Sequence, residues 1–301
     1  MKSRLRQGFA FIGLTLVACP STKETPGATT VSVVGPTVAH PAPSTSVTQS
    51  AEPAPVTPPP TEVWPPPKPD VQTDWCTSTV DALDEETCYV LPDAPASELL
   101  VYLHGIVPPT KESVQKTAFQ AVVANAARRA SAVALIPRGR QGLAGKSRPG
   151  WWGWPTSALQ HKEHAAALVR SIVERQQKLE ALVGRAFTKR YVAGSSSGAY
   201  FVSALALHGD IEADGFGAMS GGARAFGADP AKLEPKPFYI GYGTHDTVGP
   251  SAEALATHLR AARWPVLVRK HPLGHGAKEI YLDEAFPFWR SAPAQQDKLP
   301  P

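Results

Sequence analysis

The 301-residue sequence is poor in cysteine and lacks the common motifs of metal- and nucleotide-dependent enzymes. It contains three cysteines, no C-x-x-C pair, no H-E-x-x-H motif and no phosphate-binding loop, so no metal or cofactor is expected. It also lacks a block of basic residues, and its formal charge of +4 comes from 30 basic and 26 acidic side chains. Nucleic acid is therefore not an expected partner.

One hydrophobic stretch, GFAFIGLTLVAC, follows a short basic start. Its length suits a signal peptide and is short for a membrane-spanning helix. It ends in LVAC at Cys19, which resembles the lipobox of bacterial lipoproteins. The resemblance implies removal of residues 1–18, lipidation of Cys19 and anchoring in the cell envelope. Because Pro20 replaces the aspartate typical of inner-membrane retention, the outer membrane is expected. The alternative is an ordinary secretory signal with a chance cysteine.

A proline-rich segment, residues 19–70, follows the signal. It buries too little apolar surface to offset the entropy of ordering, so we expect a disordered linker. Residues 71–291 are long enough for one domain with its own core, and 292–301 are expected to be a tail.

Cys76 and Cys88 remain as a pair in an exported chain, which predicts a disulfide; the alternative is two reduced cysteines.

Short apolar runs alternate with helical patterns through the predicted domain. Strands are expected at 98–105, 131–137, 190–194, 214–221, 236–243 and 265–271, and helices at 111–130, 157–182, 197–209, 251–262 and 277–290. This alternation predicts an α/β fold, a mostly parallel sheet with helices on both faces. Functional residues in such folds lie in loops at the carboxyl ends of the strands.

The pentapeptide GSSSG, residues 194–198, follows one of these strands and opens a helix. It fits G-x-S-x-G in the strand-turn-helix setting that exposes the central serine at the edge of a sheet. Ser196 occupies the central position and is the expected nucleophile. The alternative is a serine-rich loop without a catalytic role. A nucleophilic serine needs a base to take its proton and an acid to orient that base.

Candidates for both partners follow in the order serine, acid, histidine that is typical of α/β-hydrolases. Asp246 lies in a GTHD turn, and His275 lies in a Gly-His pair beyond the last strand. Over residues 90–291 the chain therefore resembles the α/β-hydrolase superfamily. Its GTxD turn and Gly-His pair are most similar to secreted polyester-depolymerase and feruloyl-esterase-type carboxylesterases. The chain departs from their pattern at Val248, which stands two residues beyond the acid rather than three. The resemblance implies a serine hydrolase that cleaves carboxylic esters.

Other residues compete for these two roles. His271 is the alternative base, although it belongs to the predicted strand, and Asp229 is the alternative acid. His245, next to Asp246, is interpreted as a neighbour of the acid. Four histidines in helical patterns are expected to be solvated or to cap helices: His161, His164, His208 and His258.

The oxyanion of an acyl-transfer intermediate needs two N–H donors. The residue after the nucleophile, Ser197, supplies one. The His104-Gly105 turn resembles the His-Gly turn of the hydrolase family, which implies the N–H of Ile106 as the second donor. His104 itself is expected to stabilise the turn.

A tryptophan-rich loop follows the strand at 131–137. Trp151, Trp152 and Trp154 either line a substrate site or pack this loop onto the domain.

Because a fold does not fix a function, three alternatives to the esterase stay open. They are a peptidase or amidase, a transferase that uses the same acyl-enzyme, and a non-catalytic surface protein that retains the scaffold.

Overall fold

The computed structural model describes residues 64–223 and 228–296. The predicted signal peptide, residues 1–18, and the predicted lipidation site at Cys19 lie outside the described residues, as does most of the predicted linker. In the part of the chain that the structure describes, no helix combines the length and apolar character needed to cross a bilayer.

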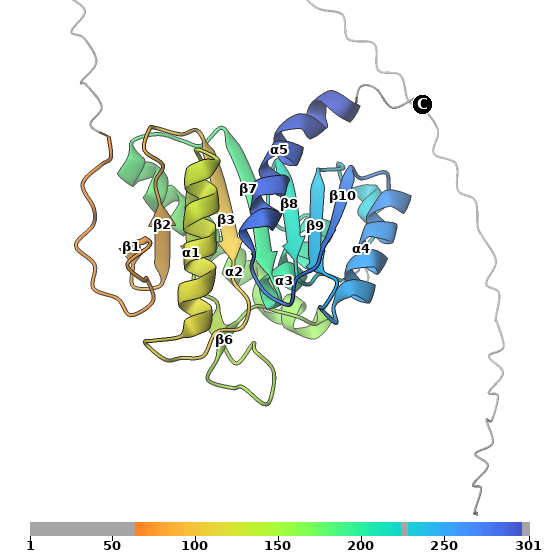
Figure 1. Cartoon of the computed structure of the whole chain (residues 1–301), viewed down its shortest axis with the longest axis horizontal. Helices are drawn as coiled ribbons and strands as arrows, with labels where there is room; N and C mark the ends of the chain where they lie inside the picture. The colour runs from red at the N-terminus through yellow and green to blue at the C-terminus, as the bar shows by residue number, and fades with distance from the viewer. Residues whose placement is uncertain (1–63, 224–227, 297–301) are drawn as a thin grey trace, which may run out of the picture. The chain divides into compact units, whose positions relative to one another are not determined.

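An eight-stranded sheet forms the centre of the fold (Figure 1). Its strands are β1 (Asp81–Asp84), β2 (Thr87–Val90), β3 (Glu98–Leu103), β4 (Val133–Pro137), β7 (Lys189–Ser195), β8 (Gly215–Met219), β9 (Phe238–Gly243) and β10 (Val266–His271). Along the sheet they run in the order β1-β2-β4-β3-β7-β8-β9-β10. All pairs from β4 to β10 are parallel, whereas β2 pairs antiparallel with both β1 and β4. The predicted mostly parallel sheet is confirmed.

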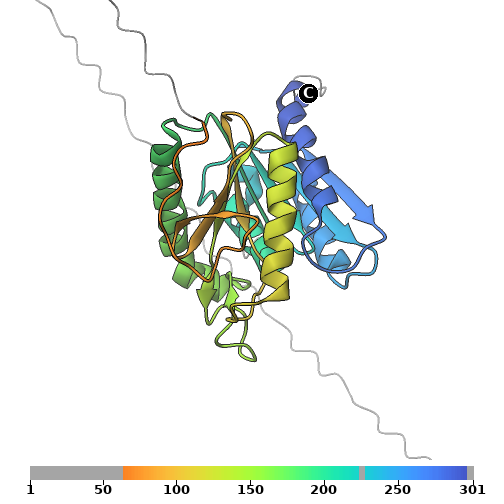
Figure 2. The same cartoon turned by 60° about the vertical axis from the view of Figure 1, so that its left-hand side comes forward.

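Helices cover both faces of this sheet (Figures 1 and 2). The α-helices are α1 (Val114–Arg129), α2 (Ala158–Val183), α3 (Ser197–His208), α4 (Gly249–Ala261) and α5 (Glu279–Gln296), with a short 3-10 helix η1 (Pro230–Lys232). Helices α1 and α5 pack on one face, and α2, α3 and α4 pack on the other. Ser157 caps α2, since its hydroxyl accepts a hydrogen bond from the Gln160 N–H.

Each face of the sheet has its own apolar core, because side chains of a strand alternate between the two faces. In β3, Leu99, Val101 and Leu103 pack on the α2–α4 face. Leu100 and Tyr102 pack on the α1–α5 face. Both sets are fully buried, which explains why the central strands read as continuous apolar runs.

Several elements differ from the sequence prediction. The edge strands β1 and β2 were not expected, and the tryptophan-rich loop contains a two-stranded sheet of β5 (Arg140–Gln141) and β6 (Trp152–Gly153). Helix α1 begins at Val114, three residues later than expected, because Ser113 caps it by accepting from the Lys116 N–H. Helix α5 continues five residues past the expected end of the domain at 291.

The segment before β1 is packed onto the sheet. The Trp64 indole donates a hydrogen bond to the Pro92 carbonyl, although residues 64–70 were expected in the linker. Trp75 is buried, and Cys76 forms a disulfide with Cys88 in β2 with a Cα–Cα distance of 5.5 Å. This is the disulfide that the sequence predicted, and it ties the segment to the sheet.

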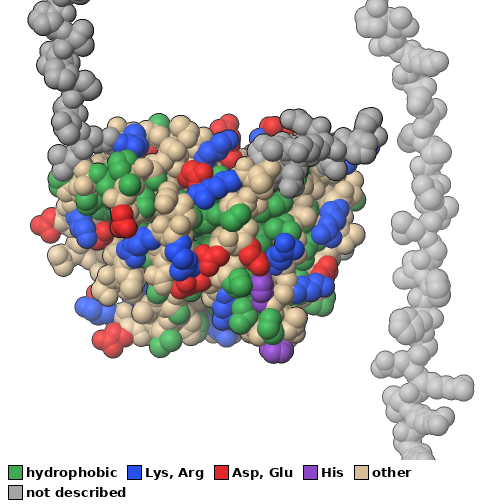
Figure 3. Space-filling view, turned by 45° about the horizontal axis from the view of Figure 1, so that its top comes forward, with side chains coloured by type: hydrophobic (Ala, Val, Ile, Leu, Met, Phe, Trp, Pro, Cys, Tyr) green, Lys and Arg blue, Asp and Glu red, His purple; other side chains and the backbone are tan. Residues whose placement is uncertain are grey.

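Acidic and basic side chains lie interspersed on the face shown in Figure 3. Many form ion pairs: Arg129 of α1 bonds both carboxylate oxygens of Asp283 in α5. Arg290 of α5 similarly bonds Glu98 of β3, which connects the helix to the sheet. An exposed pair of this kind contributes about 0–1 kcal/mol to the free energy of unfolding.

Candidate active site

Ser196 stands in a sharp turn between β7 and α3. Its φ of 52° and ψ of −119° are rare for a residue with a side chain, so the surrounding structure must hold the turn. Two backbone hydrogen bonds do so. The Ser196 N–H donates to the Met219 carbonyl at 3.0 Å, and the Gly198 N–H donates to the His104 carbonyl at 3.1 Å.

The glycines of the turn are required by the close approach of β3. A Cβ at Gly194 would lie 2.6 Å from the carbonyl oxygen of Leu103, and a Cβ at Gly198 would overlap the same oxygen. At Gly105 an added Cβ would press against Ser196 at 3.1 Å. Any side chain at these positions would therefore push the end of β3 away from the serine.

The three residues predicted as a triad lie within hydrogen-bonding distance of one another. His275 Nε2 is 2.9 Å from Ser196 Oγ, and His275 Nδ1 is 2.9 Å from Asp246 Oδ2. The Asp246 side chain is 1% exposed, whereas that of His275 is 49% exposed. Because a carboxylate accepts only, Nδ1–H donates to Asp246, which leaves Nε2 to accept the serine proton.

The loops that carry Asp246 and His275 are joined by backbone hydrogen bonds. The Thr244 N–H donates to the carbonyl of His271 at 2.8 Å, and the His245 N–H donates to that of Leu273 at 3.2 Å. The second carboxylate oxygen of Asp246 accepts from the Val248 N–H at 3.2 Å. The shorter spacing to Val248 noted in the sequence thus still supplies a backbone donor to this carboxylate.

Ser220, which the sequence analysis missed, stabilises the loop that carries His275 through a hydrogen bond. It is fully buried at the end of β8, has a φ of 47°, and donates its N–H to the Gly241 carbonyl at 2.8 Å. Its hydroxyl donates to the carbonyl of Gly276, the residue after His275, at 3.0 Å. The available signal was the Ser-Gly-Gly sequence at the end of the strand expected at 214–221.

The predicted oxyanion donors, Ile106 and Ser197, flank the nucleophile. The loop after β3 brings Ile106 to the cavity that contains Ser196, and Ser197 is the first residue of α3. Within the described part of the chain, neither backbone N–H donates to a protein acceptor. Both donors therefore remain available for a substrate oxygen.

His104 holds the loop that precedes Ile106. Its Nε2 accepts the Gly139 N–H at 2.9 Å, so its Nδ1 carries the proton and donates to the carbonyl of Gly105. The ring is buried against Trp75, Phe119 and Trp154. Burial lowers the pKa of His104 from 6.5 to about 4, so the ring is neutral at pH 7. This arrangement suits the turn-stabilising role expected from the sequence.

A cavity of about 470 Å³ opens beside Ser196 and His275. Of the three tryptophans, only Trp151 lines it. Trp154 is 1% exposed and stacks on Phe201 in the core. Trp152 is partly buried in β6, where its backbone pairs with Val107. Two of the three tryptophans thus pack the loop, and one faces the candidate substrate site.

The competing acid and base lie elsewhere. His271 ends β10 and bonds Glu284 in α5 at 3.1 Å. Asp229 caps η1 by accepting from the Ala231 N–H. Neither contacts Ser196.

One prediction about the remaining histidines was wrong. His161, expected to be solvated or to cap a helix, is 8% exposed and bonds Asp210 at 2.8 Å. Its ring lies 4.4 Å from that of His208. Burial lowers the pKa of His208, and the neighbouring His161 lowers it further.

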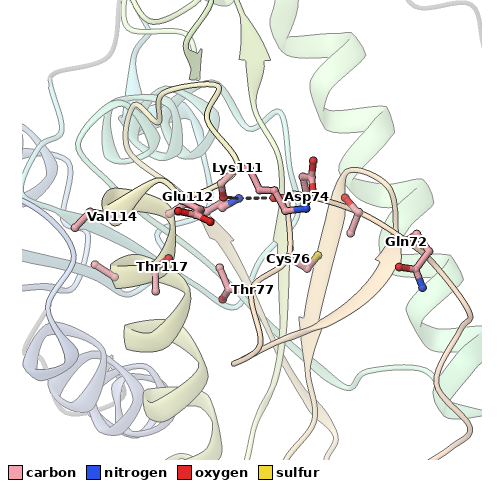
Figure 4. A pocket seen from close by; sticks show the side chains of 11 residues that line it. Gln72, Asp74, Cys76, Thr77, Lys111, Glu112, Val114 and Thr117 are labelled. Carbon is pink, nitrogen blue, oxygen red and sulfur yellow. Dashed lines mark hydrogen bonds and ion pairs between the residues drawn. The ribbon is translucent and has the colours of Figure 1, made fainter.

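A larger hollow of about 840 Å³ lies beside the start of α1 (Figure 4). Its charged side chains include Lys111 and Asp74, which form an ion pair at 2.9 Å. Of the described residues, no serine or histidine lines this hollow. Across residues 64–223 and 228–296, no group of three or more His, Cys, Asp or Glu side chains is arranged to hold a metal ion.

Neither a protein-family model nor a curated protein matches this chain. Solved structures do, and each of three examples aligns with 68% of it. The Bacillus cereus carboxylesterase is 17% identical over 93% of its own length, with a TM-score of 0.51. Esterase PE8 is 18% identical over 96%, with a TM-score of 0.50. YahD, solved with malic acid, is 17% identical over 98%, with a TM-score of 0.50. The chain has the α/β-hydrolase fold, as the sequence predicted.

The hydrogen bond from Ser220 to the Gly276 carbonyl predicts a role in positioning His275. Replacing Ser220 with alanine removes this bond and frees the loop that holds the imidazole near Ser196. Because small misplacements of a catalytic group are costly, we expect kcat to fall about tenfold or more, with KM nearly unchanged. Steady-state kinetics on a chromogenic ester measure both constants.

The control for this variant is Ser203→Ala. Ser203 is also fully buried, but its hydroxyl bonds the Ala199 carbonyl within α3. We expect Ser203→Ala to keep a kcat near wild type. Equal losses of kcat in the two variants would contradict a specific role for Ser220.

The buried neutral ring of His104 predicts acid sensitivity of the fold. In the unfolded chain its pKa is near 6.5, whereas in the folded chain it is about 4. Between these values the unfolded chain binds a proton that the folded chain does not. The free energy of unfolding therefore decreases as the pH falls from 6.5 towards 4, by on the order of 3 kcal/mol in total.

Urea unfolding at several pH values tests this link in wild type and His104→Asn. The variant is expected to be less stable at pH 7, because it loses the ring packing. Its free energy of unfolding should decline less steeply between pH 6.5 and 4.5. Parallel pH profiles for the two proteins would show that another group causes the acid sensitivity.

Proposed function

We propose that this chain is a serine hydrolase that cleaves carboxylic esters through an acyl-enzyme on Ser196. One observation carries the proposal. An unbroken series of hydrogen bonds connects the buried carboxylate of Asp246, through His275, to the hydroxyl of Ser196, with both histidine links at 2.9 Å. A cavity of about 470 Å³ opens beside the last member of this series.

In the proposed reaction Ser196 Oγ attacks the ester carbonyl while His275 Nε2 takes the hydroxyl proton. Asp246 accepts from Nδ1–H throughout, which fixes the tautomer and stabilises the imidazolium. The N–H groups of Ile106 and Ser197 bind the developing oxyanion. His275 then returns the proton to the leaving alcohol. Water attacks the acyl-enzyme by the same route, releasing the acid and restoring Ser196.

The choice of esters over amides rests on the carboxylesterase-type GTxD and Gly-His patterns around Asp246 and His275. The similar solved structures include a carboxylesterase and an esterase, which agrees with this choice without deciding it. We place the chain with the polyester-depolymerase and feruloyl-esterase type on the same two patterns. No cofactor takes part in the proposed mechanism.

The proposal predicts that a fluorophosphonate probe labels Ser196 alone. Ser196→Ala and His275→Ala should both abolish the adduct, and kcat/KM on a panel of 4-nitrophenyl esters should fall by about 10³-fold or more in each. Peptide mass mapping locates the adduct. Ser291→Ala, which changes an exposed serine of α5, serves as the control and should label normally. A folded wild-type protein with neither adduct nor turnover would favour a non-catalytic binding role.

We also propose that a lipid on Cys19 anchors the protein in the bacterial cell envelope, with the outer membrane as the expected site. The support is the LVAC sequence after a hydrophobic stretch of signal-peptide length. A Cys19→Ala variant of the full chain expressed in bacteria should lose incorporated palmitate and leave the membrane fraction. Retention of both properties in Cys19→Ala would overturn the proposed anchor.

A further inference from the structure

Two charged side chains line the cavity beside Ser196 and His275, and both are basic. Arg148 and Lys278 line it, and among the residues that the structure describes no aspartate or glutamate does. The rest of the wall is largely apolar. Its apolar side chains are those of Ile106, Val107, Ala118, Phe119, Trp151 and Ala277. The cavity thus combines an apolar wall with two positive charges.

Arg148 is held in place at this cavity by its own loop. Its guanidinium carbon lies 4.9 Å from the centre of the Trp151 ring, a cation–π distance. Its N–H donates to the Gly145 carbonyl at 3.0 Å, and its carbonyl accepts from the Trp151 N–H at 3.1 Å. These turns present Arg148 and Trp151 together to the cavity.

Lys278 is placed by the start of α5, three residues after His275. Its carbonyl accepts from the N–H of Tyr281, a fully buried core residue, at 3.2 Å. The acid next to it in sequence, Glu279, bonds Asn125 and Arg129 of α1, both at 2.8 Å. The Glu279 charge is therefore engaged by another cation, away from the cavity lining.

In the described part of the domain, other basic side chains form ion pairs with carboxylates, whereas Arg148 and Lys278 do not. In the hollow of Figure 4, Lys111 lies 2.9 Å from the Asp74 carboxylate. Among the ion pairs of the described residues, neither Arg148 nor Lys278 takes part. Both cations at the catalytic cavity thus remain open to an anion from outside the chain.

We infer that the substrate is an amphiphilic ester that carries a negative charge, with its apolar part against Trp151 and Phe119 and its anionic group at Arg148 and Lys278. The inference rests on the proposed esterase function. A carboxylate and a phosphate both match the fork of an arginine and the point charge of a lysine. The ester bond is cleaved at Ser196 as proposed above, and no bond of the anionic group forms or breaks.

Matched substrates test this inference on the acyl side of the ester. The 4-nitrophenyl monoester of adipic acid carries a terminal carboxylate, and its methyl ester is the neutral counterpart. The quantity measured is the ratio of kcat/KM for the charged ester to that for the neutral one. Arg148→Gln and Lys278→Gln should each lower this ratio about three- to tenfold at low salt. Added salt should shrink the difference.

A second pair of substrates moves the charge to the leaving group, using 3-carboxy-4-nitrophenyl butyrate and 4-nitrophenyl butyrate. The two esters differ in intrinsic reactivity, but this difference is the same for every variant. It therefore cancels when the kcat/KM ratio of a variant is divided by that of wild type. Competitive inhibition by hexyl phosphate and by hexanoate then shows which anion binds more tightly. The control is Lys162→Gln, which removes an exposed cation of α2 outside the cavity and should keep the wild-type ratio.

The inference is supported if the charged-to-neutral kcat/KM ratio falls for one pair of substrates in Arg148→Gln and Lys278→Gln but not in Lys162→Gln. The pair that responds shows whether the charge belongs on the acyl side or on the leaving group. An unchanged ratio in both pairs, with both neutral esters still hydrolysed, overturns the inference and leaves the esterase function intact. Absence of turnover and of the fluorophosphonate adduct on Ser196 refutes the proposed function itself, and the inference falls with it.

Discussion

The close contact between the end of β3 and the turn that carries Ser196 determines the geometry of the whole site. The backbone of Leu103 approaches the turn so closely that only glycine fits at Gly194 and Gly198. This contact stabilises the strained conformation of Ser196, because the Gly198 N–H can then donate a hydrogen bond from the turn to the His104 carbonyl after β3. The same approach brings the loop after β3 beside the start of α3, where an oxyanion needs its two donors.

The position of that loop depends in turn on His104, whose neutral ring bridges Gly139 and Gly105. One wall of its pocket is Trp75, from the segment before β1. The disulfide of the adjacent Cys76 fixes this segment to the sheet. A part of the chain that belongs to neither the helices nor the sheet thus supports the loop that carries Ile106. An oxidising compartment favours the disulfide that holds this part in place.

The sequence was sufficient to predict the fold and to select the three residues that lie together, because each is marked locally. Ser196 has its glycines, and Asp246 and His275 each follow a strand within a short pattern. Ser220 escaped prediction because its acceptor, the Gly276 carbonyl, lies 56 residues away and leaves no local pattern. The burial of His161 was missed for a similar reason, since it depends on contacts between α2 and the end of α3.

The charges around the cavity also bear on the proposed reaction itself. In the proposed reaction, His275 takes the serine proton and becomes a third positive group at a cavity that already holds Arg148 and Lys278. The carboxylate of Asp246 is 1% exposed, hydrogen-bonds the side of the imidazole away from Ser196 and stabilises the imidazolium, but it does not line the cavity beside Arg148 and Lys278. An anion on the substrate would offset the repulsion among the three cations during the same step. Such an anion would then favour the transition state as well as the bound substrate, which is the condition for specificity to appear in kcat.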